Sequence, residues 1–119
     1  MPKHHSGTSF VTFVRDQLSE IGEIICRPMF GGYGLYHGGR FFGILFHSRL
    51  YFKVDHASVL LYRQHGMKPF RPNAKQTLSS YYEVPADILE DADELIVWAR
   101  RACDVRAGSV VRTKRSRST

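Results

Sequence analysis

The chain has 119 residues, of which 43% are hydrophobic and 13% aromatic, so it can bury one modest core and little more. No apolar run approaches the roughly 18 residues of a membrane-spanning helix, and the first seven residues are polar rather than signal-like, which favours a cytoplasmic protein without a membrane contact. Cys26 and Cys103 lie far apart and have no C-x-x-C partner, so neither a zinc site nor a disulfide framework is predicted.

Positive charge is concentrated at the C-terminal end of the chain. The net charge is +6, and five cations follow the last acid, Asp104. These five are Arg106, Arg112, Lys114, Arg115 and Arg117. Residues 1–105 hold the other 12 of the 17 Lys and Arg residues against all 11 acids, so the folded part is predicted to be nearly neutral, at about +1. We expect one domain over residues 8–106 and a disordered basic tail over residues 107–119, which lack core residues.

The first predicted element is an amphipathic helix. Apolar residues recur at three- and four-residue intervals over residues 10–21, with Ser9 placed to cap the helix and Gly22 to end it. The period then changes to short aromatic and β-branched runs separated by glycine, which is typical of an antiparallel meander. Four strands are expected near residues 23–29, 33–37, 40–46 and 50–54.

Two reversals connect the later strands of this meander. Gly38-Gly39 fits a two-residue hairpin turn, because glycine accepts a positive φ at both central positions. Ser48-Arg49 marks the next reversal by its position between two apolar runs. The four strands are therefore predicted to pair in sequence order.

The second half of the chain predicts two more helices and one more strand. A short helix is expected over residues 57–65, a proline-containing loop over residues 67–76 and a fifth strand over residues 78–84. Asp91 and Glu94 form a capping-box pattern before the last helix, which is apolar on one face. The fold class is therefore α+β, with a five-stranded antiparallel sheet and helices at the N-terminus, in the middle and at the C-terminus.

Three glycines crowd into the segment Gly31-Gly32-Tyr33-Gly34. A phosphate-binding loop is not favoured, because such loops lead into a helix N-terminus and this one leads into another predicted strand. The segment instead indicates a turn or bulge in a sheet, where Gly31 or Gly32 adopts a positive φ and a bulky neighbour packs on bare backbone.

Residues 27–36, R-P-M-F-G-G-Y-G-L-Y, resemble the hallmark segment of the TfoX N-terminal domain family. The "LYFK" strand at residues 50–53, the loop ending in Pro69-Phe70, the "SYYxVP" segment at residues 80–85 and the last helix around Trp98 also resemble that family, in the same order. The residues that carry the resemblance are Arg27, Pro28, Met29, Phe30, Gly31, Gly32, Tyr33, Gly34, Tyr51, Lys53, Pro69, Phe70, Tyr81, Tyr82, Pro85 and Trp98.

The resemblance implies a compact α+β domain found in regulators of natural competence, which are reported to act with the cyclic-AMP receptor protein at competence promoters. The best-known members carry a second, helical C-terminal domain, whereas this chain ends soon after its last predicted helix. It is therefore similar to a stand-alone version of the domain. The resemblance implies no catalytic residues.

Residue types that could support catalysis are scattered. His37, His47, His56 and His65 sit singly at predicted turns or element ends, without the spacing of a metal site. Cys26 lies in an apolar run, which is typical of a buried thiol rather than of a nucleophile. We therefore expect no enzyme activity, no metal, no cofactor and no small-molecule ligand.

The leading hypothesis is a regulatory or adaptor domain that acts through protein contacts, in competence or transcription. One basis is the number of aromatic residues, which exceeds what one helix-covered sheet face can bury and suggests an exposed surface for a protein partner or a homodimer. The alternative is that these residues pack against one another across strands. The alternative function is weak, sequence-blind nucleic-acid binding by the five cations that follow Asp104. An enzyme of unknown chemistry is the third hypothesis.

Overall fold

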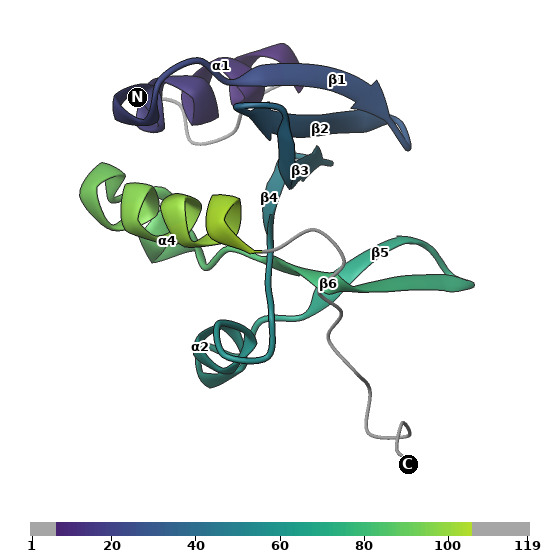
Figure 1. Ribbon diagram of the computed structural model, residues 1–119. Helices are drawn as coiled ribbons and strands as arrows, with labels where there is room; N and C mark the ends of the chain where they lie inside the picture. The colour runs from purple at the N-terminus through teal and green to yellow at the C-terminus, as the bar shows by residue number, and fades with distance from the viewer. Residues whose placement is uncertain (1–6, 106–119) are drawn as a thin grey trace.

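The computed structural model describes residues 7–105, which form one antiparallel sheet with helices packed against one of its faces (Figure 1). The α+β class predicted from the sequence is confirmed. The predicted tail over residues 107–119 lies outside the described residues, as do all five cations that follow Asp104, namely Arg106, Arg112, Lys114, Arg115 and Arg117. In chain order the elements are α1 (Gly7–Gln17), the 3-10 helix η1 (Ser19–Ile21), β1 (Ile25–Met29), β2 (Gly32–His37), β3 (Arg40–Phe46), β4 (Arg49–Lys53), α2 (Val59–Gln64), β5 (Pro69–Asn73), β6 (Gln76–Glu83), α3 (Ala86–Leu89) and α4 (Ala92–Asp104).

The sheet has six strands, in the order β1-β2-β3-β4-β6-β5, so the prediction of five strands is wrong. The additional strand is β5, which lies in the segment that Pro69 and Pro72 indicate to be a loop. β5 is an edge strand, where proline is tolerated because one side of the strand makes no ladder hydrogen bonds. Its pairing with β6 is irregular on both sides of Phe70. The edge position therefore explains why a proline-rich segment is extended here.

The predicted four-strand meander is present, and its reversals follow local backbone chemistry. Gly38 and Gly39 have φ values of 59° and 81°, as expected for a two-residue hairpin turn. The next turn lies one residue earlier than predicted, at His47 and Ser48, whose φ values are 50° and 57°. Because Phe46 pairs with Arg49, only these two residues remain to close the hairpin.

The helix termini differ in part from those predicted. α1 already includes Gly7, so Ser9 lies inside the helix rather than at its N-cap. Gly22 ends the helical segment after η1 with a φ of 112°. At α4 the predicted cap is present, because the Asp91 side chain accepts a hydrogen bond of 3.2 Å from the backbone N–H of Glu94. Within residues 7–105, no helix combines the length and the apolar character that crossing a membrane requires.

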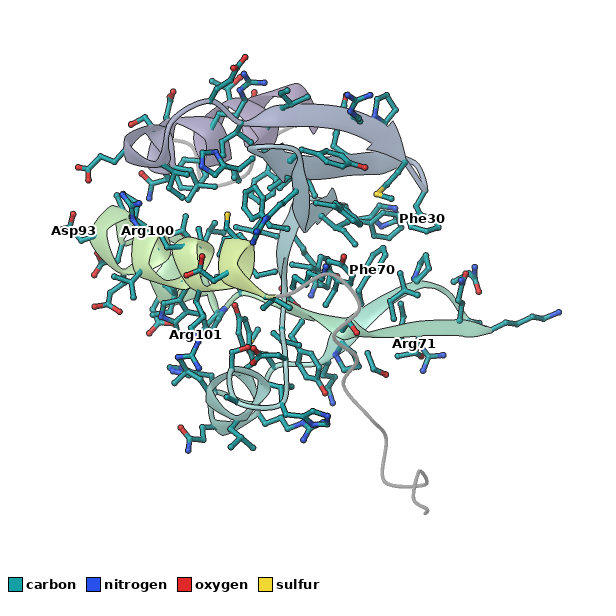
Figure 2. All side chains as sticks on the ribbon, in the orientation of Figure 1. Phe30, Phe70, Arg71, Asp93, Arg100 and Arg101 are labelled. Carbon is teal, nitrogen blue, oxygen red and sulfur yellow. The ribbon has the colours of Figure 1, made fainter. Side chains whose placement is uncertain are left out.

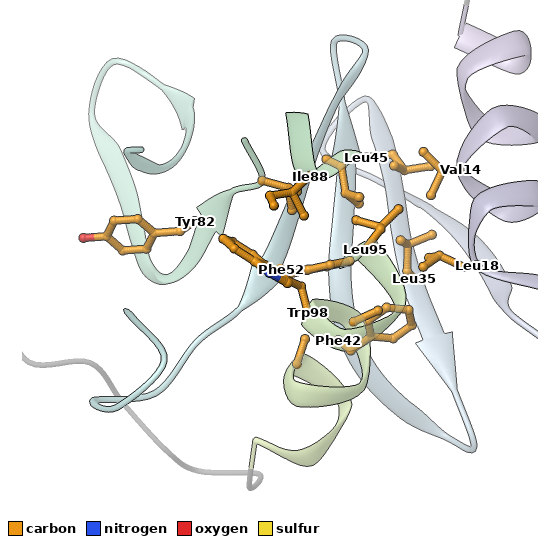
Figure 3. Packing of buried hydrophobic residues seen from close by; sticks show 14 of the residues in the cluster. Val14, Leu18, Leu35, Phe42, Leu45, Phe52, Tyr82, Ile88, Leu95 and Trp98 are labelled. Atoms are coloured by element: carbon orange, nitrogen blue, oxygen red, sulfur yellow. The ribbon is translucent and has the colours of Figure 1, made fainter. Parts of the chain in front are cut away.

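The main core lies between the helices and one face of the sheet (Figure 3). Val14 and Leu18 of α1 and Leu95 of α4 are fully buried there, together with Phe42 and Phe52 from the central strands. Burying a side chain of this size contributes about 1.5–3 kcal/mol. These contacts fix α1 and α4 on the same face of the sheet.

A β-bulge in β3 bends the centre of the sheet. Leu35 of β2 pairs with Gly43, and the next residue, Tyr36, pairs with Phe41, so Phe42 has no partner on β2. Gly43 gives the bulge room, because a Cβ there would lie 3.0 Å from the carbonyl oxygen of the neighbouring strand β4. A bulge increases the local twist and bends its strand.

The sheet curls enough to bring its two edge regions together (Figure 1). Phe30, in the turn between β1 and β2, packs against Phe70 of β5 with ring centroids 5.9 Å apart, although β1 and β5 lie at opposite ends of the strand order. The face turned away from the helices is therefore concave.

Candidate functional site on the second face of the sheet

The concave face of the sheet holds a second apolar cluster, which we call the aromatic face. Residues alternate in direction along β4, so Leu50 and Phe52 enter the main core while Tyr51 points to this face. The buried members of the aromatic face are Ile44, Tyr51 and Phe70, and its partly buried members are Met29, Phe41, Phe46, Leu78 and Tyr81.

Phe70 is the centre of one group of rings. Its ring centroid lies 4.8 Å from that of Tyr51 and 5.2 Å from that of Phe46, and Phe30 closes the group from the β1–β2 turn. Figure 2 shows Phe30 and Phe70 facing each other across the concave side. Two segments of the family motif, around residues 30 and 70, therefore meet in space.

A second group of rings extends the aromatic face toward the β2–β3 turn. Phe41 packs against Tyr36 at 5.1 Å and against Tyr81 at 5.3 Å between ring centroids. The guanidinium of Arg27 lies 5.4 Å from the centroid of Tyr36, within cation–π range. Burial, with a smaller effect of Tyr36, raises the pKa of Tyr81 to about 12, so its hydroxyl stays neutral at physiological pH. This arrangement favours packing rather than proton transfer.

The three motif glycines have different roles, in a turn, against a neighbouring strand and against side chains. Gly31 has a φ of 82°, which confirms the predicted positive φ in this segment, and forms the β1–β2 turn with Phe30. Gly32 has no such conformation, but a Cβ on it would overlap the carbonyl oxygen of Leu45 in β3. A Cβ on Gly34 would lie 2.9 Å from the Met29 sulfur.

The remaining motif residues do not join the aromatic face. Pro28 is exposed in the edge strand β1, Pro69 begins β5, and Lys53 is half-buried at the end of β4. On the helix side lie Tyr33, Tyr82, Pro85 and Trp98. The motif residues are therefore distributed over both faces of the sheet, and their polar groups do not form one cluster.

The histidines remain separate in the folded domain. The Nδ1 atom of His37 lies 3.0 Å from the carbonyl oxygen of Glu23, His47 stacks on Phe46, and His65 packs edge-on against Trp98. Across residues 7–105, no group of three His, Cys, Asp or Glu residues is placed to hold a metal ion.

The two cysteines occupy different surroundings. The Arg15 guanidinium donates to the sulfur of Cys26 over 3.7 Å. Burial, followed by the charge of Asp104, raises the pKa of Cys103 to about 11, so that thiol is protonated at neutral pH. In the described part of the chain neither thiol is hydrogen-bonded to a histidine, which a cysteine nucleophile would need as its base.

A separate apolar surface lies on the helices, at positions not predicted from the sequence. Leu60 and Leu61 of α2 are 55% and 38% exposed, and Val97 of α4 is 60% exposed. Leu61 and Val97 line an open depression of about 70 Å³ together with Tyr62 and Trp98. We call Leu60, Leu61 and Val97 the α2–α4 surface. Its signal in the sequence is the pair Leu60-Leu61, which falls between the buried positions of α2.

The aromatic residues of the sheet are largely covered by one another. Phe30, at 47%, is the one aromatic residue among the large hydrophobic residues classed as exposed in residues 7–105. Most aromatic residues that the main core does not hold therefore pack against one another in a second cluster. This is the alternative that the sequence left open to an exposed aromatic partner surface. The surface with the most exposed large aliphatic side chains is the α2–α4 surface.

Comparison with known protein families supports the resemblance that the motif residues indicate. A search of curated proteins finds no match to this chain. The sequence profile of the TfoX N-terminal domain matches residues 16–105, which is more than half of the 119-residue chain and covers every motif residue named above. The chain therefore belongs to the TfoX N-terminal domain family.

Proposed function

We propose that this chain is a regulatory or adaptor domain, acting in competence or transcription, that binds another protein through the α2–α4 surface. The observation that carries the proposal is the exposure of Leu60, Leu61 and Val97 beside a depression walled by Tyr62 and Trp98. Protein interfaces commonly place apolar and aromatic groups at their centre. Arg101, which also lines the depression, supplies a polar rim.

The roles of the motif residues support a binding function over a catalytic one. Gly31 sets a turn, Gly32 allows β2 and β3 to approach each other, and Phe70 organises the aromatic face. These are contributions to the scaffold, and the α2–α4 surface, which no motif residue other than Trp98 lines, offers exposed apolar side chains for binding. An apolar surface between two helices binds through shape and burial, which is how adaptor domains act.

We propose a second copy of the chain as one such partner. Addition of strands at the sheet edges is disfavoured, because Pro28 lies in the edge strand β1 and Pro69 and Pro72 lie in the edge strand β5. A homodimer would therefore form through helices rather than by extending the sheet.

The test introduces a charge into the α2–α4 surface and a matched charge elsewhere. Val97→Glu is the test variant, and Ile25→Glu is the control, because Ile25 is also apolar and 44% exposed but lies on β1. Tagged proteins are compared by light scattering and by quantitative pull-down from the native host. We expect Val97→Glu alone to lose self-association or the partner enriched by the parent. Equal binding by both variants would contradict the proposal.

A further inference from the structure

The end of the β5–β6 pair projects from the body of the sheet. β4 pairs with β6 only at residues 81–83, so residues 76–79 have β5 as their only neighbouring strand. Figure 1 shows this pair extending away from the helices. We call residues 68–79 the β5–β6 ribbon. Its tip, residues 73–77, is exposed to solvent, whereas Phe70 at its base is buried in the aromatic face.

The tip of the ribbon is held by its own hydrogen bonds. The Asn73 side-chain oxygen accepts a bond of 2.9 Å from the backbone N–H of Lys75, and the Arg71 guanidinium donates over 2.7 Å to the carbonyl oxygen of Ala74. A guanidinium has five N–H donors, so this single bond leaves Arg71 able to contact a ligand. The cations of the tip are therefore held on an ordered turn.

The near-neutral charge of the domain conceals two separate poles. Residues 56–82 contain Arg63, Lys68, Arg71 and Lys75 and no acid, and all four cations are exposed. Residues 83–94 contain six acids and no Lys or Arg. Figure 2 shows Arg71 on the ribbon and Asp93 at the opposite end of the view. Residues 56–82 therefore have an excess of positive charge, and Arg71 on the ribbon lies away from Asp93 at the start of α4.

A depression at the base of the ribbon adds to the positive pole. It has a volume of about 320 Å³ and is lined by Arg49, Lys68 and Arg71, with one acid, Glu83. Glu83 is paired with Arg49, whose Nη1 lies 3.1 Å from the carboxylate. The cations outnumber the acid, so the depression favours an anionic group.

We propose that the β5–β6 ribbon binds the phosphate backbone of duplex nucleic acid. At about 3.3 Å per strand residue, Lys68, Arg71 and Lys75 are spread over roughly 20 Å of the ribbon. Such a line of charges matches a linear polyanion, and a two-stranded ribbon is narrow enough to enter the major groove of DNA. This site is distinct from both the α2–α4 surface and the C-terminal tail.

Two features of the ribbon favour duplex nucleic acid over other anions. None of the large apolar side chains exposed in residues 7–105 belongs to the ribbon, so it lacks the apolar anchor that a protein interface normally requires. Its tip residues, from Asn73 to Thr77, include no aromatic ring on which the bases of a single strand could stack. Backbone phosphates need neither feature.

The test measures the binding of the full chain to a 20-base-pair duplex of arbitrary sequence by fluorescence anisotropy, between about 50 and 200 mM salt. The test variant is Lys68→Gln/Arg71→Gln/Lys75→Gln. The control removes the same charge from exposed cations on α1, β3 and α4, as Arg15→Gln/Arg40→Gln/Arg100→Gln. Circular dichroism verifies that both variants fold, and a poly-glutamate chain is the competing acidic polypeptide.

Three phosphate contacts change the slope of log affinity against log salt by about 2.7, because each contributes about 0.9. We expect the slope of the ribbon variant to be smaller by this amount. Between about 50 and 200 mM salt the parent should therefore lose about 40-fold more affinity than the ribbon variant. The control should keep the slope of the parent. Equal loss in both variants, no duplex binding by the parent, or equally tight binding of poly-glutamate would each overturn the proposal.

Discussion

Gly31 and Gly32 are neighbours, but the structure predicts that replacing them with alanine has very different costs. Gly31 has a φ of 82°, and a Cβ built on it would meet nothing within 4 Å. A Cβ on Gly32 would overlap the carbonyl oxygen of Leu45 and lie 3.1 Å from its carbonyl carbon. Both atoms belong to the backbone of β3, so the strand itself must move.

The two costs follow from these surroundings. At Gly31 the left-handed conformation costs an alanine about 1–2 kcal/mol, and the reduced entropy of the unfolded chain offsets about 0.4–1 kcal/mol of it. The net effect of Gly31→Ala is therefore about 1 kcal/mol. At Gly32 the steric overlap costs about 1–3 kcal/mol, and displaced β2–β3 hydrogen bonds add about 1 kcal/mol each. Gly32→Ala should therefore destabilise the fold by about 3 kcal/mol or more.

Urea unfolding followed by the fluorescence of Trp98, the single tryptophan, measures both values. With a slope of about 1.5 kcal/mol per molar urea, the midpoint should fall by about 2 M for Gly32→Ala and by less than about 1 M for Gly31→Ala. Gly38→Ala is the control for the conformational cost alone, because Gly38 also has a positive φ and no neighbour within 4 Å. If Gly32→Ala unfolds at the same urea concentration as Gly31→Ala, the close approach of β2 and β3 is not a constraint.

Three further predictions concern titratable groups. Asp55 closes the turn before α2 by accepting hydrogen bonds from the backbone N–H groups of Ala57 and Ser58, so Asp55→Ala should destabilise the domain by about 1 kcal/mol in urea unfolding at pH 7. The bond from Ser58 is the main cause that lowers the Asp55 pKa below 3.8, so this contribution should be present above pH 3.8 and disappear as the pH falls through the folded-state value. Burial raises the pKa of Tyr81 from 10.0 to about 12, so the contribution of its neutral hydroxyl to stability should be complete below pH 10 and be lost as the pH rises toward 12. In thermal melts, Tyr81→Phe should therefore lose less stability than the parent over this alkaline range. The raised pKa of Cys103, about 11, predicts that iodoacetamide modifies this thiol slowly at pH 8 in the folded protein and rapidly after unfolding, as measured by mass spectrometry of the digested protein.

The elements that the sequence predicted well are those that local interactions determine. β1 to β4 lie within two residues of their predicted bounds, because the change from helical to strand periodicity and the glycine pair at residues 38–39 act between near neighbours. The N-cap at Asp91 is also local, since its partner Glu94 is three residues away. β5 was missed for the opposite reason. Its prolines exclude a central strand, and only the completed sheet places this segment at an edge.

The same distinction applies to the candidate sites. The sequence located the glycine segment and its positive φ, but the constraint on Gly32 comes from Leu45, which approaches only when β2 and β3 pair. The aromatic count did not reveal that Phe30 and Phe70 pack across a curled sheet, and the α2–α4 surface requires two helices that are distant in sequence to lie side by side.

Composition and local pattern by themselves determined the α+β class and the meander, because each depends on residue types at short spacings. The ordered motifs of the sequence also carried the resemblance to the TfoX N-terminal domain family, which the family profile confirms. The positions of charge and apolar surface depended on the tertiary structure. The sum of charges over residues 1–105 is nearly neutral, whereas the fold places Arg71 on a projecting ribbon and Asp93 at the start of α4. Electrostatic attraction depends on distances in space, and those distances exist only after the sheet has curled and the helices have packed.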